Sequence, residues 1–251
     1  MRLIDYVAPA NLLDGRTIAI TGAGDGIGRA VALACGQAGA QVVLMGRTIR
    51  KLESVYDQLE QCGAPEPAIY PVELQGATLA DYEAFAETLS SSFGKLHGLL
   101  HNAGELGSRS PIDLYEPDEF AKVMHVNVTA AFLLTRALLP LLKSTGDGSI
   151  VFTSSGVGRK ARAYWGAYAI SKFATEGMMQ VLADELESAG AVRVNSLNPG
   201  AVRTNMRANA YPAENPASLV SPAQIAPAYL YLLGPDSRSV HGQALSAQPN
   251  D

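Results

Sequence analysis

One stretch of sequence decides the fold of this chain: Thr21-Gly22-Ala23-Gly24-Asp25-Gly26-Ile27-Gly28. A β-branched and apolar run at residues 17–21 leads into it, and helical periodicity follows at residues 27–38. Glycines at such a junction allow a tight turn, let the backbone approach a pyrophosphate, and let the helix pack close to the sheet. The helix N-terminus also attracts negative charge. The stretch therefore predicts a dinucleotide-binding unit, with a plain tight turn as the alternative.

Short apolar runs alternate with helical periodicity along the rest of the chain. The runs fall at residues 17–21, 41–45, 69–72, 98–101, 149–153 and 192–197, and a short strand is predicted at 244–247. Helices are predicted at residues 27–38, 50–61, 80–92, 117–143, 164–188 and 222–233. Because the runs do not alternate with polar residues, they are typical of parallel strands buried on both faces. The sequence predicts an α/β fold: a single-domain Rossmann fold whose doubly wound parallel sheet has about seven strands and helices on both faces.

A single domain is predicted over residues 1–251, because no linker, repeat or low-complexity segment divides the chain. Residues 1–14 form an N-terminal extension to that domain. The longest stretch without clear periodicity, residues 199–220, is rich in Pro, Ala and Asn. A loop of that length in a compact domain is usually functional. We therefore expect residues 203–220 to form a substrate-loop region.

Composition and charge exclude several classes of protein. The chain is 47% hydrophobic and 17% charged, which predicts a packed globular protein. The net charge is −5, and no row of Lys and Arg is suited to successive phosphates, so no nucleic-acid partner is expected. The longest apolar stretch, residues 130–142, is shorter than the roughly 20 residues of a membrane span. It predicts a buried helix and no membrane partner.

The N-terminus and the cysteines indicate the compartment and the metal content. Residues 1–16 lack an apolar core followed by a small-residue cleavage site, so a cytoplasmic location is expected. Cys35 and Cys62 are not spaced as metal ligands, and both fall in segments that look helical. We expect buried free thiols and no metal site.

The end of the second predicted strand indicates the cofactor. In dinucleotide-binding folds this position reads the adenosine ribose, and a carboxylate there favours NAD. Here the strand ends Met45-Gly46-Arg47, without an acid. Arg47 is placed for a bidentate contact with a 2′-phosphate, although a solvated arginine beginning a loop is the alternative. Together with the missing acid, Arg47 predicts NADP(H) in preference to NAD(H).

Tyr168 and Lys172 are candidates for proton transfer. They are four residues apart in a predicted helix and so share one face. A phenol with an ordinary pKa of about 10 can act near neutral pH when a neighbouring ammonium favours the phenolate. Ser155 ends the fifth strand, on the side of a parallel sheet where ligands bind, and its hydroxyl is suited to a carbonyl oxygen. The alternatives are a packed Tyr beside a solvent-reaching Lys, and a helix cap at Ser155.

Several motifs together resemble the short-chain dehydrogenase/reductase family, in its TGxxxGxG and YxxxK branch. They occur in the family's order and spacing: TGAGDGIG, His101-Asn102-Ala103-Gly104, Asn127, Ser155, Tyr168-Ala169-Ile170-Ser171-Lys172 and Asn198-Pro199-Gly200. The resemblance runs from Gly15 to about Gln248. Residues 155–159 and 165–179 are also similar to the YciK-type bacterial oxidoreductases, a subgroup to which we assign no substrate.

The resemblance implies a catalytic set of four residues. Tyr168 would protonate a carbonyl as hydride arrives from the nicotinamide. Lys172 would hold the nicotinamide ribose and lower the pKa of the tyrosine, and Ser155 would orient the carbonyl. Asn127 would anchor a water that links Lys172 to solvent.

The resemblance also implies contacts to the cofactor beyond the glycine stretch. They would come from Asn102, Ala103, Gly104, Pro199, Gly200, Val202 and Thr204, with Glu73 and Leu74 near the adenine. Three positions depart from the common pattern. Glu73 replaces an Asp, His101 replaces an Asn and is expected to form a strand-end hydrogen bond, and Asp25 must point away from the pyrophosphate to avoid like-charge repulsion.

The substrate expected from the resemblance is a small carbonyl compound or the corresponding alcohol. Arg159, Lys160 and Arg162 could attract an anionic substrate, but a solvated loop is the favoured interpretation. A 3-oxoacyl-[acyl-carrier-protein] reductase is an alternative; it is disfavoured because Ala189, with acids nearby, stands where those enzymes carry a basic docking residue. A non-catalytic NADP-binding sensor is another, since fold does not determine function. Homodimers or homotetramers through the helices at 117–143 and 164–188 are implied.

Overall fold

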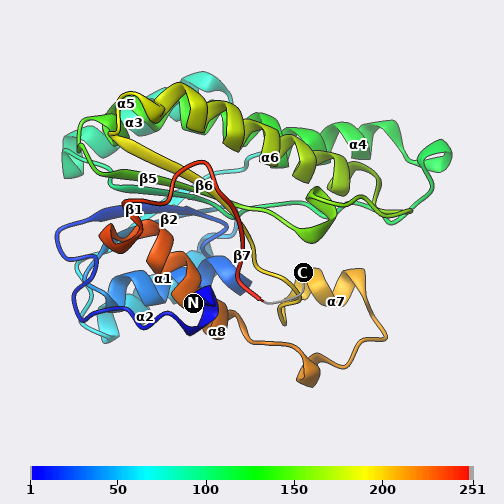
Figure 1. Cartoon of the computed structure of the whole chain (residues 1–251), viewed down its shortest axis with the longest axis horizontal. Coiled ribbons are helices and arrows are strands. Elements are labelled where there is room, and N and C mark those ends of the chain that lie inside the picture. Colours follow the sequence, from blue (N-terminus) through cyan, green and yellow to red (C-terminus); the bar gives the residue numbers. More distant parts are fainter. Residues whose placement is uncertain (1, 249–251) are drawn as a thin grey trace.

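A parallel sheet runs through the centre of the molecule, between two layers of helices (Figure 1). The computed structural model describes residues 2–248. The strands are β1 (Thr17–Thr21), β2 (Gln41–Gly46), β3 (Ala68–Pro71), β4 (Gly98–His101), β5 (Gly148–Thr153), β6 (Val192–Asn198) and β7 (Ala244–Ser246). Their order in the sheet is β3-β2-β1-β4-β5-β6-β7. The order reverses between β1 and β4, and ligands bind at such a switch point, beyond the carboxyl ends of the strands.

Helices cover both faces of this sheet (Figure 1). One layer holds α3 (Leu79–Phe93), α4 (Pro117–Met124), α5 (Ala130–Lys143) and α6 (Gly166–Glu187). The other holds α1 (Gly26–Gln37), α2 (Ile49–Gln61) and α8 (Pro222–Leu233). Each layer encloses its own apolar core against the sheet. The predicted α/β fold with a doubly wound sheet is therefore confirmed, and the predicted bounds agree with the observed ones to within about two residues at most element ends.

Two local predictions are wrong, and a third is right in its bounds but misses an irregularity. The helix predicted at 117–143 is present, but it contains a π-helical turn, His125–Thr129, between α4 and α5. The predicted loop contains the short helix α7 (Asn205–Ala210), which the Thr204 hydroxyl caps and which six residues are too few to reveal by periodicity. Cys35 is buried as expected, but Cys62 is exposed because it lies at the C-terminal end of α2, where the helix leaves the core.

The N-terminal extension packs against α8. Leu12 and Leu13 are buried in the same core as α1 and α8. The Tyr6 hydroxyl donates a hydrogen bond of 2.7 Å to Asp236, and the Tyr6 ring lies 5.1 Å from that of Tyr231 on α8. The extension therefore covers the outer side of this helix.

The long helical stretch Pro117–Lys143 packs on the sheet by one side only. It meets the criteria of length and composition for a helix that crosses a membrane, and core helices of soluble proteins meet the same criteria. Leu134 and Leu138 on its inner side are buried, whereas Phe132 is 50% exposed. The expected buried helix is thus buried on one face.

Candidate active site

A cleft of about 840 Å³ lies at the carboxyl ends of the strands. The segments that line it follow β1, β2, β3, β4, β5 and β6. The predicted site residues in its lining are Gly22, Gly24, Asp25, Gly26, Ile27, Arg47, Glu73, Leu74, Asn102, Ala103, Gly104, Ser155, Tyr168, Lys172, Pro199, Gly200, Val202 and Thr204. Gly28 and Asn127 lie outside that lining. The volume falls in the range of cofactor and ligand pockets.

The glycine stretch and the loop after β4 are locked together at the switch point. The Thr21 hydroxyl accepts hydrogen bonds of 3.0 Å from the backbone N–H groups of Asn102 and Ala103. The Asn102 amide donates to the Thr21 carbonyl at 3.2 Å. A Cβ at Gly28 would lie 2.2 Å from the Gly22 carbonyl oxygen, so only glycine lets α1 approach the turn this closely. Gly28 therefore determines how close α1 lies to the glycine turn, although Gly28 itself does not line the cleft.

The negative charge of the Asp25 carboxylate is compensated by contacts with two other cleft segments. Its carboxylate accepts hydrogen bonds from the Gly26 N–H at the start of α1 (2.7 Å), from Lys51 Nζ (2.6 Å) and from the Asn205 amide (3.1 Å). The hydrogen bond from Lys51 is the main reason that the pKa of Asp25 is lowered. The acid in the glycine stretch thus has cationic and amide partners, which reduces its repulsion of a bound phosphate.

Cations border the cleft where β2 ends. Arg47 follows β2 directly and is exposed, and Lys51 lies on the first turn of α2. Glu73 and Leu74, which follow β3, line the same end. At the far end of the cleft, the Asn198 amide nitrogen is buried without a hydrogen-bond partner among residues 2–248. An unpaired donor is available there to an acceptor on a ligand, so the cleft suits a polar, anionic molecule such as a dinucleotide.

Ser155, Tyr168 and Lys172 converge at one end of the cleft. Lys172 Nζ donates a hydrogen bond of 2.7 Å to the Thr153 carbonyl and lies 5.6 Å from the centre of the Tyr168 ring. The pKa of Tyr168 is raised to about 12 by burial, not lowered as the resemblance implied, and a hydrogen bond with Ser155 opposes that rise. Burial lowers the pKa of Lys172 to about 8, and the charge of Glu176 opposes that fall. The site therefore holds a protonated phenol beside an amine that titrates near neutral pH.

Asn127 lies in the π-helical turn between α4 and α5. Its amide nitrogen donates to the Glu105 carbonyl and to the Ser171 hydroxyl, both at 2.9 Å. Its amide oxygen accepts from the Glu105 N–H at 2.7 Å. Such turns are frequent at functional sites because they redirect a side chain from its helical position. Here the turn lets Asn127 join the loop after β4 to α6.

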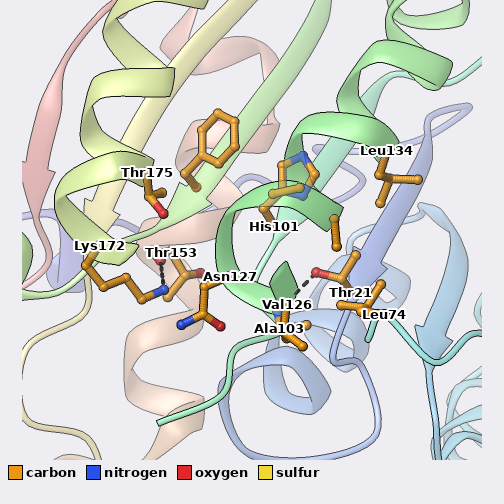
Figure 2. A pocket seen from close by; sticks show the side chains of 13 residues that line it. Thr21, Leu74, His101, Ala103, Val126, Asn127, Leu134, Thr153, Lys172 and Thr175 are labelled. Carbon is orange, nitrogen blue, oxygen red and sulfur yellow. Dashed lines mark hydrogen bonds between the residues drawn. The ribbon is translucent and has the colours of Figure 1, made fainter. Parts of the chain in front are cut away.

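A cavity of about 10 Å³ lies between Asn127, Lys172 and His101 (Figure 2). This volume is about the least that can hold a single water. His101 shares a hydrogen bond of 2.8 Å with the Thr135 hydroxyl and stacks on Phe152. Burial, together with the charge of Lys172, lowers the pKa of His101 to about 3, so the imidazole is neutral. His101 has the strand-end hydrogen bond that we expected.

Comparison with known proteins shows the family. The model of the short chain dehydrogenase family matches residues 16–215. The chain belongs to the short-chain dehydrogenase family.

Relatives of this short-chain dehydrogenase match nearly its whole length. The oxidoreductase YciK of Escherichia coli (strain K12) is 48% identical over 97% of this chain and 96% of its own. A short chain dehydrogenase from Pseudomonas syringae is 56% identical, with a TM-score of 0.95, over 97% of this chain and 99% of its own. A short chain dehydrogenase from Escherichia coli CFT073, complexed with NADPH, is 49% identical, with a TM-score of 0.93, over 96% of this chain and 100% of its own. The chain is thus a YciK-like oxidoreductase of the short-chain dehydrogenase family.

Some cleft residues of this short-chain dehydrogenase were missed from the sequence. The Arg109 guanidinium lies 4.9 Å from the Trp165 ring and 5.1 Å from the Tyr211 ring, and it donates to the Ala210 carbonyl at 2.6 Å. The Trp165 ring lies 5.8 Å from that of Tyr168. No sequence pattern links these residues, because they come from three segments that only the fold brings together. They place the expected substrate loop beside Tyr168.

The favoured interpretation of the basic run after Ser155 is wrong for Arg159. Lys160 and Arg162 are exposed, as a solvated loop requires. Arg159 instead forms an ion pair of 2.9 Å with Glu176 on α6. A partner seventeen residues away on another element left no local pattern to detect.

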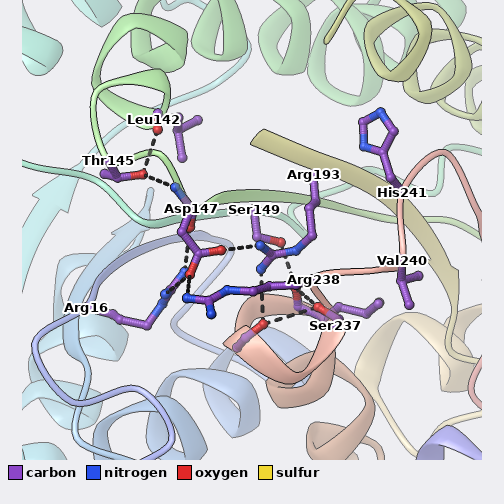
Figure 3. Close-up of polar contacts among 12 residues, drawn as sticks. Arg16, Leu142, Thr145, Asp147, Ser149, Arg193, Ser237, Arg238, Val240 and His241 are labelled. Atoms are coloured by element: carbon purple, nitrogen blue, oxygen red, sulfur yellow. Dashed lines mark hydrogen bonds and ion pairs between the residues drawn. The ribbon is translucent and has the colours of Figure 1, made fainter. Parts of the chain in front are cut away.

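A second cluster of charges surrounds Asp147 (Figure 3), at the edge of the sheet where β1, β5 and β6 begin. The Asp147 carboxylate accepts hydrogen bonds from Arg16 (2.8 Å), Arg238 (3.1 Å) and Arg193. Burial alone would raise the pKa of Asp147, but the three arginines hold it well below its usual range. The cluster joins the starts of β1, β5 and β6 to the segment after α8.

Proposed function

We propose that this short-chain dehydrogenase is an NADP(H)-dependent oxidoreductase. It reduces the carbonyl group of a small molecule, or oxidises the corresponding alcohol, with Tyr168 as general acid and base. The observation that carries the proposal is the convergence of Ser155, Tyr168 and Lys172 at one end of a cleft that Arg47 borders at its other end. Strongly perturbed pKa values in a cleft are typical of catalytic groups.

NADPH, when bound, supplies the hydride. The glycine stretch and the start of α1 would hold its pyrophosphate, and Arg47, with Lys51 nearby, would bind its 2′-phosphate. The Ser155 hydroxyl donates a hydrogen bond to the carbonyl oxygen of the substrate. Tyr168, protonated because its pKa is raised to about 12, then donates its proton to that oxygen. The Lys172 ammonium stabilises the phenolate that remains, and Asn127 holds the water from which Tyr168 is reprotonated through Lys172.

A free substrate suits the cleft better than a carrier-bound one. Glu185 and Glu187 are exposed at the end of α6, beside the exposed Ala189. An acidic carrier protein would meet like charge on this surface. Faster turnover of carrier-bound than of free carbonyls would contradict this part of the proposal.

Titration with NADPH and with NADH, followed by nicotinamide fluorescence, tests the cofactor before any substrate is known. We expect NADPH to bind more tightly. Arg47→Gln is expected to weaken NADPH binding by about 10- to 100-fold, as the loss of a hydrogen bond to a charged group of about 1.5–3 kcal/mol, while leaving NADH binding unchanged. Arg50→Gln, an exposed neighbour, serves as the control. Preference for NADH would refute the role assigned to Arg47. Failure to bind either nucleotide would refute the proposal that the chain is a nicotinamide-dependent enzyme.

We further propose that the enzyme forms homodimers or homotetramers in the cytoplasm. Large apolar side chains are exposed on α5 and α6: Phe132 is 50%, Phe173 44% and Val181 60% exposed. Exposed apolar side chains that gather on one surface indicate a protein interface. Sedimentation at micromolar concentration is expected to show dimers or tetramers, and Phe173→Asp to dissociate them. A monomer before substitution would contradict the proposal.

A further inference from the structure

Glu176 is a carboxylate buried next to the proposed catalytic group. Its side chain is only 7% exposed. One oxygen accepts from the Ser154 hydroxyl at 2.6 Å and from Arg159 Nε at 2.9 Å, and the other accepts from the Ser196 hydroxyl at 2.6 Å. A buried carboxylate remains charged only when it is paired and hydrogen-bonded in this way. These contacts therefore pair the carboxylate of Glu176 and fix its position.

Arg159 is itself fixed by the last strand of the sheet. It donates to the Leu245 carbonyl at 2.7 Å and to the Ser246 hydroxyl at 3.0 Å. With Glu176 it joins β7, β6, the end of β5 and α6 into one network. The arginine thus satisfies the carboxylate without reaching the cleft, whose lining does not include it.

Two links connect this network to the proposed catalytic residues. Ser154, which donates to Glu176, directly precedes Ser155. Glu176 also follows Lys172 by four residues in α6, so the two side chains lie on one face of the helix. Near Lys172 also lie the Thr153 carbonyl on β5, the neutral His101 on β4, the phenol of Tyr168 and, across the small cavity, the amide of Asn127. Glu176 therefore supplies negative charge to a lysine beside which these other groups are uncharged.

We propose that Glu176, held in place by its ion pair with Arg159, is a positioning residue for the catalytic group. Through Ser154 it fixes the turn that carries Ser155, and through its charge it keeps Lys172 an ammonium. The inference rests on the proposed function for the roles of Ser155 and Lys172. Neither Glu176 nor Arg159 contacts a reacting atom.

The sign of the electrostatic effect follows from burial. Burial lowers the pKa of Lys172 to about 8, and the charge of Glu176 opposes that fall. Removal of the charge must lower the pKa further, because the opposing attraction is lost. Lys172 would then lose its proton at a lower pH, and the phenolate of Tyr168 would lose its cationic partner there.

Nitrogen NMR of the lysine ammonium groups tests the inference on the full chain, without cofactor or substrate. Lys172→Met identifies the signal. In Glu176→Gln, which keeps the size of the side chain, we expect the pKa of Lys172 to fall by about 1. In Arg159→Met the carboxylate loses the cation that holds it in place, and we expect a fall of the pKa of Lys172 in the same direction. Lys160→Met, an exposed neighbour of Arg159, is the control and should change nothing.

An unchanged pKa of Lys172 in folded Glu176→Gln would overturn the inference, while leaving the NADPH titration and the proposed function untouched. If Arg159→Met does not fold, Glu176→Gln alone decides. Once a substrate is found, the upper pH limit of kcat/KM should move down in Glu176→Gln, whereas a purely structural role would lower activity equally at every pH.

Discussion

The parallel strands begin at one side of the sheet, here called the amino edge, and end at the other, the carboxyl edge. Partly or fully buried charges are paired differently at these two edges. At the amino edge, Asp147 is surrounded by three arginines from separate parts of the chain (Figure 3). At the carboxyl edge, Lys172 has a carbonyl as its hydrogen-bond partner (Figure 2) and a carboxylate one helical turn away. The first arrangement leaves its acid fully ionised, whereas the second leaves an amine with a pKa of about 8.

The two arrangements therefore suit different purposes: the first stabilises the fold, and the second suits proton transfer. A carboxylate that is fully paired has no reason to exchange protons at neutral pH, so the cluster at Asp147 fixes strands to one another. A lysine that is desolvated and weakly paired exchanges protons near neutral pH, as a group that assists catalysis must. Substitutions at the two edges should therefore affect different measurements.

The largest expected effect is on activity at the carboxyl edge. Tyr168→Phe removes the proposed proton donor but keeps the ring, so kcat should fall by about 10²- to 10⁴-fold, the usual contribution of general acid catalysis. NADPH affinity and the free energy of unfolding should change little, because only a hydroxyl is lost. Tyr164→Phe, at an exposed position just before α6, is the matched control and should keep full activity.

A folded Tyr168→Phe variant with full activity on any carbonyl substrate would contradict the catalytic assignment. A protein that binds NADPH tightly but turns over no carbonyl compound, before or after the substitution, would instead support a sensor.

The next largest effect is on stability at the amino edge. Asp147→Asn removes the charge that three arginines share. Breaking a buried ion pair costs about 3–5 kcal/mol of unfolding free energy, and the partial exposure of Asp147 and Arg238 places the expected loss at or below the lower end of that range. Urea unfolding measures this loss. NADPH affinity should not change, since Asp147 is absent from the lining of the cleft. Asp57→Asn, exposed on α2, is the control and should be neutral. Equal stability of the two variants would show that the cluster contributes nothing.

Most of the fold could be predicted from the sequence because it depends on local signals. The apolar runs mark β1 to β7, and the glycine stretch marks the turn into α1. Tyr168 and Lys172 could also be paired from sequence, since a spacing of four residues in a helix places both on one face. These patterns can be recognised in the sequence without knowledge of tertiary contacts.

The features that could not be predicted leave no recognisable pattern in the local sequence. The π-helical turn at His125–Thr129 hardly disturbs an apolar pattern, so the sequence predicts a continuous helix there. The pairing of Arg159 with Glu176, and of Asp25 with Lys51, joins elements that only the folded sheet brings together. The sequence therefore predicts a solvated Arg159, although α6 and β7 hold it in the structure.

The smallest expected effect is on the pH dependence of the unfolding free energy. The pKa of Asp147 is lower in the folded chain than its unfolded value of about 3.9, so its stabilisation is complete above that pH and is lost as the pH falls through the folded value. The difference in unfolding free energy between the unmodified chain and Asp147→Asn should be constant from about pH 5 to 8 and shrink below about pH 4. Lys172 also has a lowered pKa, but its window lies above about 8, where the unfolded chain binds the extra proton. A difference that changed near pH 8 would place the coupling at Lys172, and would mean that the two edges of the sheet do not act independently.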